Sequence, residues 1–158
     1  MKNFQFRYAT EKDASLVLGF IKGIATYEKM LDEVINTEEQ IREVVFGKGH
    51  AEVIFVLEDG KEVGFALFFH NYSTFVGRAG IYLEDLFVLP EYRGRGYGKA
   101  LFCKVARIAK ERGCGRLEWT CLDWNTPSIN FYLSMGAVPM DEWTTYRLTA
   151  EKIDELLR

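Results

Sequence analysis

The stretch Leu86-Phe87-Val88-Leu89-Pro90-Glu91-Tyr92-Arg93-Gly94-Arg95-Gly96-Tyr97-Gly98 carries the clearest structural signal in this chain of 158 residues. Its apolar first half predicts a strand that Pro90 ends, and apolar residues at helical spacing predict a helix over residues 97–112. Between them, glycines at alternate positions let backbone N–H groups approach an anion, which the positive end of the helix also attracts. The segment is therefore typical of a phosphate-binding junction, to which Arg93 and Arg95 would add full charges.

Two familiar phosphate-binding motifs do not fit this loop. It lacks the Gly-Lys-Ser/Thr ending of a nucleoside-triphosphate loop, and its glycine spacing is not that of the dinucleotide-binding fingerprint. A helix-entry turn without any ligand stays an alternative. What remains is the spacing Arg-x-x-Gly-x-Gly, formed by Arg93, Gly96 and Gly98.

The segments on either side of this stretch predict a mixed α/β domain. Asp59-Gly60 predicts a tight β-hairpin turn, and Thr37-Glu38-Glu39-Gln40 predicts a capping box that starts a short helix ending at Gly47. The expected strands cover residues 4–8, 53–57, 63–69, 81–89, 117–122 and 146–148, and the expected helices follow Thr10, Thr37 and Thr149 or cover residues 97–112 and 128–135. No repeat or linker interrupts this order, so we expect a single domain over residues 1–158.

Composition and charge exclude several classes of function. The net charge is -3 with basic residues spread along the chain, so we expect no nucleic-acid partner. Cys103, Cys114 and Cys121 form no CxxC or Cys/His cluster, which indicates neither a disulfide framework nor a metal site. No segment approaches the roughly 18 apolar residues of a membrane span, and the N-terminus lacks a signal-peptide core. We therefore expect a cytoplasmic protein with no membrane association.

Two groups of carboxylates stand out. Glu84 and Asp85 are adjacent within the apolar run of residues 81–89. Alternation along a strand sends neighbours to opposite faces, so at least one of the two is expected in a polar cleft or an ion pair. The second group follows the first expected helix and consists of Glu28, Asp32 and Glu33. Solvated loop charges are the simpler explanation for that group.

On these residues the chain resembles the GNAT acetyltransferases, whose acetyl-CoA signature is Gln or Arg, two residues, Gly, one residue, and Gly or Ala. The order of strands and helices agrees with that family over the whole chain, which implies a central, mostly antiparallel mixed sheet flanked by helices. Within the family the chain resembles spermidine/spermine acetyltransferase and its thialysine-acetylating relatives. The residues that carry this similarity are Tyr82-Leu83-Glu84-Asp85, Glu91-Tyr92-Arg93-Gly94, Asp123-Trp124-Asn125 and Asn130-Phe131-Tyr132.

The resemblance implies where acetyl-CoA binds. Backbone groups of the strand before the loop would hold the pantetheine arm, the loop would hold the pyrophosphate, and no metal or other cofactor is implied. The residues implied to contact acetyl-CoA are Leu86, Phe87, Val88, Arg93, Gly94, Arg95, Gly96, Tyr97, Gly98, Lys99 and Asn125. A helix cap is an equally good explanation for Asn125, because it precedes an expected helix.

The resemblance also implies a catalytic pair. An alkylamine with a pKa of ~10.4 is almost fully protonated at pH 7, so acetylation needs a base, and Glu84 matches the family's general base, which often acts through water. The leaving CoA thiolate needs a proton, and Tyr132 matches the family's general acid. The residues implied to contact the amine are Tyr27, Glu28, Glu33, Phe75, Glu84 and Asp85.

We expect an N-acetyltransferase that forms a homodimer and acts on a small primary amine, either a diamine or polyamine or a thialysine-like amino acid. Two departures weaken a polyamine assignment: Phe75 stands where polyamine enzymes tend to carry Trp, and Trp143-Thr144 replaces a pair of glutamates. The alternatives are acetylation of a protein or peptide, and a CoA-binding sensor without turnover. The presence of both Glu84 and Tyr132 argues against the sensor.

Overall fold

A computed structural model describes residues 3–158 of the chain. These residues form two compact units, residues 3–120 and 121–158. Met1 and Lys2, which the expected domain includes, lie outside the described residues.

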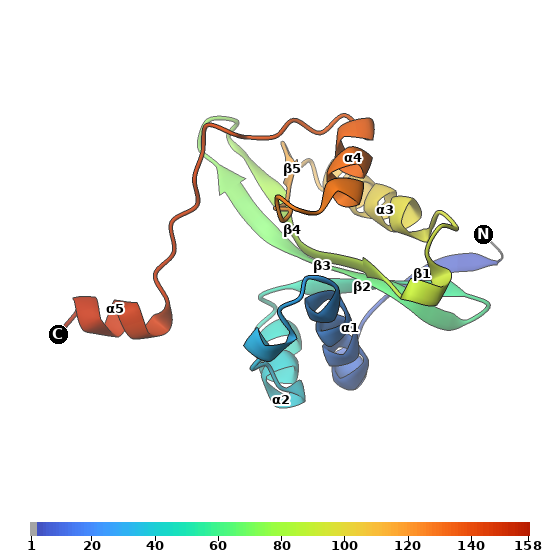
Figure 1. Cartoon of the computed structure of the whole chain (residues 1–158), viewed down its shortest axis with the longest axis horizontal. Coiled ribbons are helices and arrows are strands. Elements are labelled where there is room, and N and C mark those ends of the chain that lie inside the picture. Colours follow the sequence, from blue (N-terminus) through green and yellow to red (C-terminus); the bar gives the residue numbers. More distant parts are fainter. Residues whose placement is uncertain (1–2) are drawn as a thin grey trace. The chain divides into compact units, whose positions relative to one another are not determined.

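The first unit is built on a five-stranded sheet with the order β1-β2-β3-β4-β5 (Figure 1). Its strands are β1 (Phe4–Tyr8), β2 (Glu52–Glu58), β3 (Lys61–Ser73), β4 (Arg78–Val88) and β5 (Leu117–Glu118). The first four pair antiparallel, and β5 pairs with β4 in parallel. The expected mixed, mostly antiparallel sheet is confirmed.

Helices cover both faces of this sheet. One face carries α1 (Ala14–Tyr27) and α2 (Glu38–Gln40), which continues as the π-helical segment η3 (Ile41–Gly47), and the other face carries α3 (Tyr97–Glu111) (Figure 1). Shorter 3₁₀ turns are η1 (Glu11–Asp13), η2 (Leu31–Glu33) and η4 (Pro90–Tyr92). The expected capping box is present, since the Gln40 amide donates to Thr37 Oγ1 at 3.1 Å.

Aromatic packing fixes the position of β4 against α1. Phe20 stacks on Phe65 with ring centroids 5.2 Å apart, and its edge meets Phe87 at 6.4 Å. A Cβ atom at Gly23 would lie 2.8 Å from the Phe87 ring, so only glycine allows this close approach of the helix to the strand. The second half of α1 and the end of β4 are therefore held close together.

The turn between β2 and β3 follows the sequence prediction. Asp59 and Gly60 adopt φ angles of 48° and 82°, the positive values that a two-residue hairpin turn of type I′ requires. The expected hairpin is confirmed.

One residue of β4 departs from regular pairing with β3. Leu83 stands opposite Phe68 and Asp85 opposite Leu67, so Glu84 has no partner on β3. Glu84 is therefore the extra residue of a β-bulge, which bends the strand and re-aims its side chains.

The sheet also opens near this bulge. β5 covers Leu117–Glu118 instead of the expected residues 117–122, and it pairs only with Ile81 and Tyr82 of β4. Among the residues that the structure describes, 83–88 of β4 have no strand on their outer side. The predicted length of β5 is wrong because an apolar pattern does not tell where a neighbouring strand diverges.

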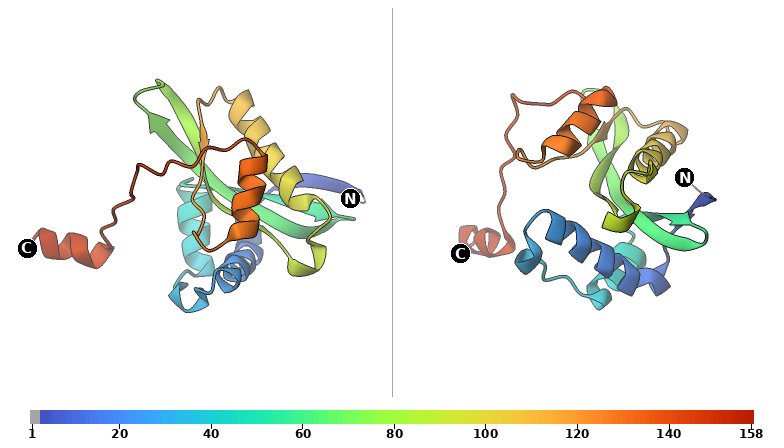
Figure 2. Two further views of the ribbon diagram at one scale, coloured as in Figure 1. Left: turned by 45° about the horizontal axis from the view of Figure 1, so that its top comes forward. Right: turned by 45° about the vertical axis from the view of Figure 1, so that its right-hand side comes forward.

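The second unit consists of α4 (Thr126–Ser134), α5 (Ala150–Leu156) and the segment between them (Figure 2). The expected cap of the last helix is confirmed, because the Lys152 amide donates to Thr149 Oγ1 at 3.3 Å. The expected strand over residues 146–148 is wrong. These residues form no ladder with any described residue, and the Tyr146 side chain is 91% exposed. A strand needs a partner, which alternation alone does not supply.

Neither a membrane span nor a metal cluster is found within residues 3–158. No helix there combines the length and the apolar composition that crossing a bilayer requires. No group of three or more His, Cys, Asp or Glu side chains is arranged there to hold a metal ion.

Candidate active site

The glycine loop (residues 93–98) joins the end of β4 to the start of α3 by way of η4. Gly94 and Gly96 adopt φ angles of 74° and 88°, a left-handed conformation that residues with a Cβ atom rarely enter. Gly96 is the N-cap of α3, and its carbonyl accepts the first helical hydrogen bond from the Ala100 amide at 3.0 Å. Glycine is thus required here by the turn itself.

Alternate residues of the loop anchor it to the rest of the unit. The Arg93 guanidinium lies over the rings of Tyr27 and Phe87, at 4.9 and 5.2 Å from their centroids, and its Nε donates to the Val88 carbonyl at 3.0 Å. Arg95 pairs with Glu58 at 3.3 Å. The expectation that both guanidinium groups are directed to a phosphate is therefore revised, since each has protein partners.

Tyr97 is the third anchor. Its side chain is 1% exposed, and its hydroxyl donates to Glu58 Oε1 at 2.6 Å. Tyr97 is among the residues expected to contact acetyl-CoA, but its hydroxyl is directed to Glu58. Only the backbone of Tyr97 is left for a ligand.

The glycines of the loop have no side chains to cover their backbone amides. In the part of the chain that the structure describes, the amides of Gly94, Gly96 and Gly98 donate to no protein acceptor. They lie at the positive N-terminal end of α3, which has fifteen residues, and Lys99 follows with an exposed side chain. Free amides and a helix dipole together suit a pyrophosphate.

The outer edge of β4 leads into this loop. The Phe87 side chain is buried in the α1 core and Val88 is also buried, so Leu86, Phe87 and Val88 can offer a ligand mainly their backbone groups. Because β5 does not reach these residues, no described strand of the first unit pairs with that edge.

An acidic cluster lies where the bulge meets the end of α1, and it consists of Glu28, Glu84 and Asp85. Glu28 is the C-cap of α1, with its amide bonded to the Ile24 carbonyl at 2.9 Å. Asp85 stands opposite Leu67, whose side chain belongs to the core under α1. Asp85 therefore lies on the face of the sheet that α1 covers. Glu84 is exposed.

Charges in this cluster act on one another. Burial raises the pKa of Asp85 to about 7, with further contributions from Glu84 and then Glu28. Burial also raises the pKa of Glu28, with a further contribution from Glu84. The prediction that Glu84 and Asp85 point to opposite faces is therefore revised, because the bulge interrupts the alternation and Glu84 lies near both of the other carboxylates.

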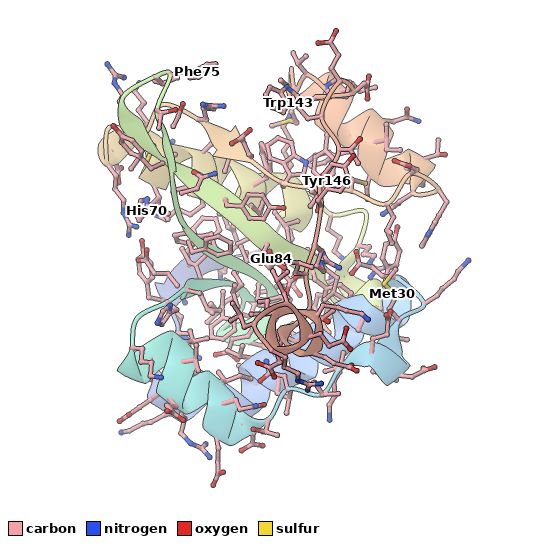
Figure 3. All side chains as sticks on the ribbon, turned by 90° about the vertical axis from the view of Figure 1, so that its left-hand side faces the viewer. Met30, His70, Phe75, Glu84, Trp143 and Tyr146 are labelled. Carbon is pink, nitrogen blue, oxygen red and sulfur yellow. The ribbon has the colours of Figure 1, made fainter. Side chains whose placement is uncertain are left out.

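Three predicted amine-binding residues, Phe75, Glu33 and Tyr27, lie outside the acidic cluster. Phe75 is 94% exposed in the turn between β3 and β4, whereas Glu84 lies in the middle of β4 (Figure 3). Glu33 is exposed at the end of η2. Tyr27 lies beneath Arg93, beside the loop, and its neighbour Glu28 belongs to the cluster.

Asn125 and Tyr132 belong to the second unit. Asn125 is the N-cap of α4, where Oδ1 accepts a hydrogen bond from the Ser128 amide at 3.4 Å, so its capping role is confirmed. Tyr132 lies on α4 next to Phe131, with ring centroids 5.5 Å apart.

Sequence reasoning missed Glu58. It ends the apolar run of β2 and precedes the Asp59-Gly60 turn, so its pattern is that of an ordinary hairpin residue. No local signal reveals that its carboxylate meets Arg95 and Tyr97, which are 37 and 39 positions further along the chain.

Residues 19–137 match the family model described as Acetyltransferase (GNAT) family. The chain belongs to the GNAT acetyltransferase family. GNAT enzymes use acetyl-CoA as the acetyl donor, and this chain is accordingly an N-acetyltransferase. The glycine loop and the open edge of β4 both fall within the matched residues.

Curated relatives extend the GNAT match to nearly the whole chain. A thialysine N-epsilon-acetyltransferase of Sus scrofa is 37% identical over 168 aligned positions, which cover 99% of this chain and 98% of the relative. An L-ornithine N5-acetyltransferase of Arabidopsis thaliana is 44% identical over 100 positions, covering 63% of this chain and 44% of that protein. Among solved structures, an integron cassette protein from the mobile metagenome of V. cholerae superposes with a TM-score of 0.82 at 27% identity, covering 100% of this chain and 99% of that chain.

Proposed function

We propose that residues 1–158 form one GNAT domain that transfers an acetyl group from acetyl-CoA to a small primary amine carrying a second positive charge. The observation that carries this proposal is the acidic cluster of Glu28, at the end of α1, with Glu84 and Asp85 on the bulged strand that leads into the glycine loop. Acceptor-binding carboxylates and an acetyl-CoA site would then share β4. No metal is needed for this chemistry.

Acetyl-CoA is proposed to lie along the outer edge of β4. Its pantetheine amides would pair with the backbone of Leu86 and Val88, and its pyrophosphate would accept hydrogen bonds from the free amides of the glycine loop. Lys99 would add a charge from the first turn of α3. Asn125 is proposed to assist the pantetheine arm in addition to capping α4.

The acidic cluster is proposed to bind the amine and remove its proton. At pH 7 the neutral form of an alkylamine is disfavoured by roughly 4.6 kcal/mol, given a pKa of ~10.4. The ammonium first loses one proton, which Glu84, directly or through one water, passes to solvent; the neutral nitrogen then attacks the thioester carbon and releases its second proton to Glu84. Glu28, together with the ionised fraction of Asp85, adds to the negative potential that attracts the cationic acceptor.

The leaving sulfur is proposed to take its proton from Tyr132. As the N–C bond forms and the C–S bond breaks, the Tyr132 phenol protonates the thiolate, and the resulting phenolate regains a proton from solvent. The products are an N-acetyl amine and CoA-SH.

For the acceptor we favour an amino acid of the thialysine or lysine type, or a short diamine. Full-length similarity to a thialysine N-epsilon-acetyltransferase supports this choice, and so does the ornithine acetyltransferase among the relatives. Phe75 and Trp143-Thr144 depart from the pattern of polyamine enzymes, which favours a shorter acceptor. A cytoplasmic location and a homodimer stay predictions from the sequence and the family.

The proposal is tested by measuring CoA release with acetyl-CoA and each of thialysine, lysine, ornithine, putrescine, spermidine and a lysine-containing peptide. We expect kcat/KM to be highest for one of the small dications. A higher value for the peptide would favour the protein acetyltransferase alternative. Tight acetyl-CoA binding with no turnover of any acceptor would favour the sensor.

A further inference from the structure

A single partly buried carboxylate ties together two of the three anchored residues of the glycine loop. Glu58, at the end of β2, has a side chain that is 14% exposed. Its Oε1 accepts the Tyr97 hydroxyl at 2.6 Å and lies 3.3 Å from Arg95 Nη1. The Arg95 guanidinium also donates to the Glu91 carbonyl at 3.2 Å, so the loop is held from both sides.

This arrangement constrains the residue between the two anchors. Arg95 and Tyr97 flank Gly96, which is the N-cap of α3 and adopts a φ of 88°. With both neighbours held by one carboxylate, the Gly96 peptide has little freedom to turn. Its amide, and those of Gly94 and Gly98, are then oriented before a ligand arrives, which reduces the ordering entropy lost on binding.

We propose that Glu58 is a positioning residue for acetyl-CoA: through Tyr97 and Arg95 it holds the amides of the glycine loop in the orientation that binds the pyrophosphate. This inference rests on the proposed function and deepens it. Glu58 touches neither the acetyl donor nor the acceptor in this account, and its contribution is limited to the phosphate-bearing half of acetyl-CoA.

The ion pair with Glu58 also affects what Arg95 can contribute to phosphate binding. Because the Arg95 charge is already paired, Arg95 contributes less to phosphate binding than its place in the motif implies. Removing the negative charge from Glu58 therefore tests two opposed effects: a loosened loop weakens phosphate binding, whereas a released Arg95 strengthens it. The short bond to Tyr97, which is buried, favours the first effect.

The test compares two acetyl donors in Glu58→Gln. For acetyl-CoA we expect Kd, measured by calorimetry, to rise about tenfold, the effect of losing roughly one charge-assisted hydrogen bond. For S-acetylpantetheine, which lacks the pyrophosphate, we expect kcat/KM within twofold of the wild-type value. Tyr97→Phe should reproduce this pattern and serves as the second variant if Glu58→Gln does not fold.

Glu52→Gln is the matched control. Glu52 lies at the other end of β2 and pairs with Arg112, beyond the far end of α3, at 2.6 Å. The substitution Glu52→Gln therefore removes an ion pair that lies away from the glycine loop. Its acetyl-CoA affinity should equal that of the wild-type protein.

Three outcomes would overturn the inference. Equal losses with both donors would mean that Glu58 stabilises the fold alone. Unchanged or tighter acetyl-CoA binding in Glu58→Gln would mean that the loop does not depend on it. An equal loss in Glu52→Gln would make the effect nonspecific. Failure of the wild-type protein to bind acetyl-CoA would instead refute the proposed function itself.

Discussion

The ionisation of Asp85 makes folding stability depend on pH in a direction that the structure fixes. Burial, with help from Glu84 and Glu28, raises the pKa of Asp85 from 3.8 to about 7 in the folded protein. Between these two values the folded state binds more protons than the unfolded state, so wild-type stability falls as pH rises. The stability that protonated Asp85 contributes to the folded state is fully present below pH 3.8. It falls as pH rises and is lost once pH passes through 7.

Asp85→Asn removes this dependence, since an amide does not titrate. From pH 5.5 to the folded pKa of about 7 is about 1.5 pH units, and at 1.36 kcal/mol per unit the variant should gain up to about 2 kcal/mol over wild type. The difference should level off above pH 8. For a chain of this size it corresponds to roughly 4–8 °C in melting temperature.

Urea unfolding of both proteins at several values between pH 5.5 and 8.5 measures the difference directly. Asp141→Asn, which removes an exposed carboxylate, provides the control. A stability difference between Asp85→Asn and wild type that stays constant over this range would mean that Asp85 ionises as it does in the unfolded chain, and the reasoning from burial and neighbouring charge would be refuted.

Three further predictions concern binding and catalysis. Gly96→Val should weaken acetyl-CoA binding at least tenfold in calorimetry, because valine rarely adopts the φ of 88° at this N-cap; unchanged affinity in a folded variant would contradict this. Glu84→Gln should lose kcat/KM most strongly near pH 7 and partly recover near pH 10, where free amine is abundant; an identical loss at both pH values would exclude a base. Tyr132→Phe should lower kcat roughly 100-fold with little change in amine KM, and a wild-type rate would remove Tyr132 from the mechanism.

Features that depend on neighbouring residues could be predicted from the sequence. The capping box at Thr37, the Asp59-Gly60 turn and the glycine-rich entry to α3 each follow from local backbone preferences, and the structure contains all three. The acidic pair Glu84-Asp85 could likewise be identified, because two carboxylates in an apolar run need an explanation.

Features that depend on distant pairing could not be predicted. The bulge at Glu84 is a mismatch between two strands, and the apolar pattern of β4 is the same with or without it. Glu58 acquires its role only when β2 meets the start of α3. The expected strand at Tyr146 has a suitable pattern but lacks a described partner.

The bulge divides β4 into two halves of opposite phase. Before it, Tyr82 stacks on Phe69, with ring centroids 5.3 Å apart; after it, Asp85 and Phe87 face the same side of the sheet as Phe69. A strand one residue shorter would keep a continuous even-and-odd pattern and would still complete the sheet. The acidic cluster therefore depends on the length of β4 as much as on its composition, because deleting residue 84 would remove both the mismatch with β3 and one of the three carboxylates.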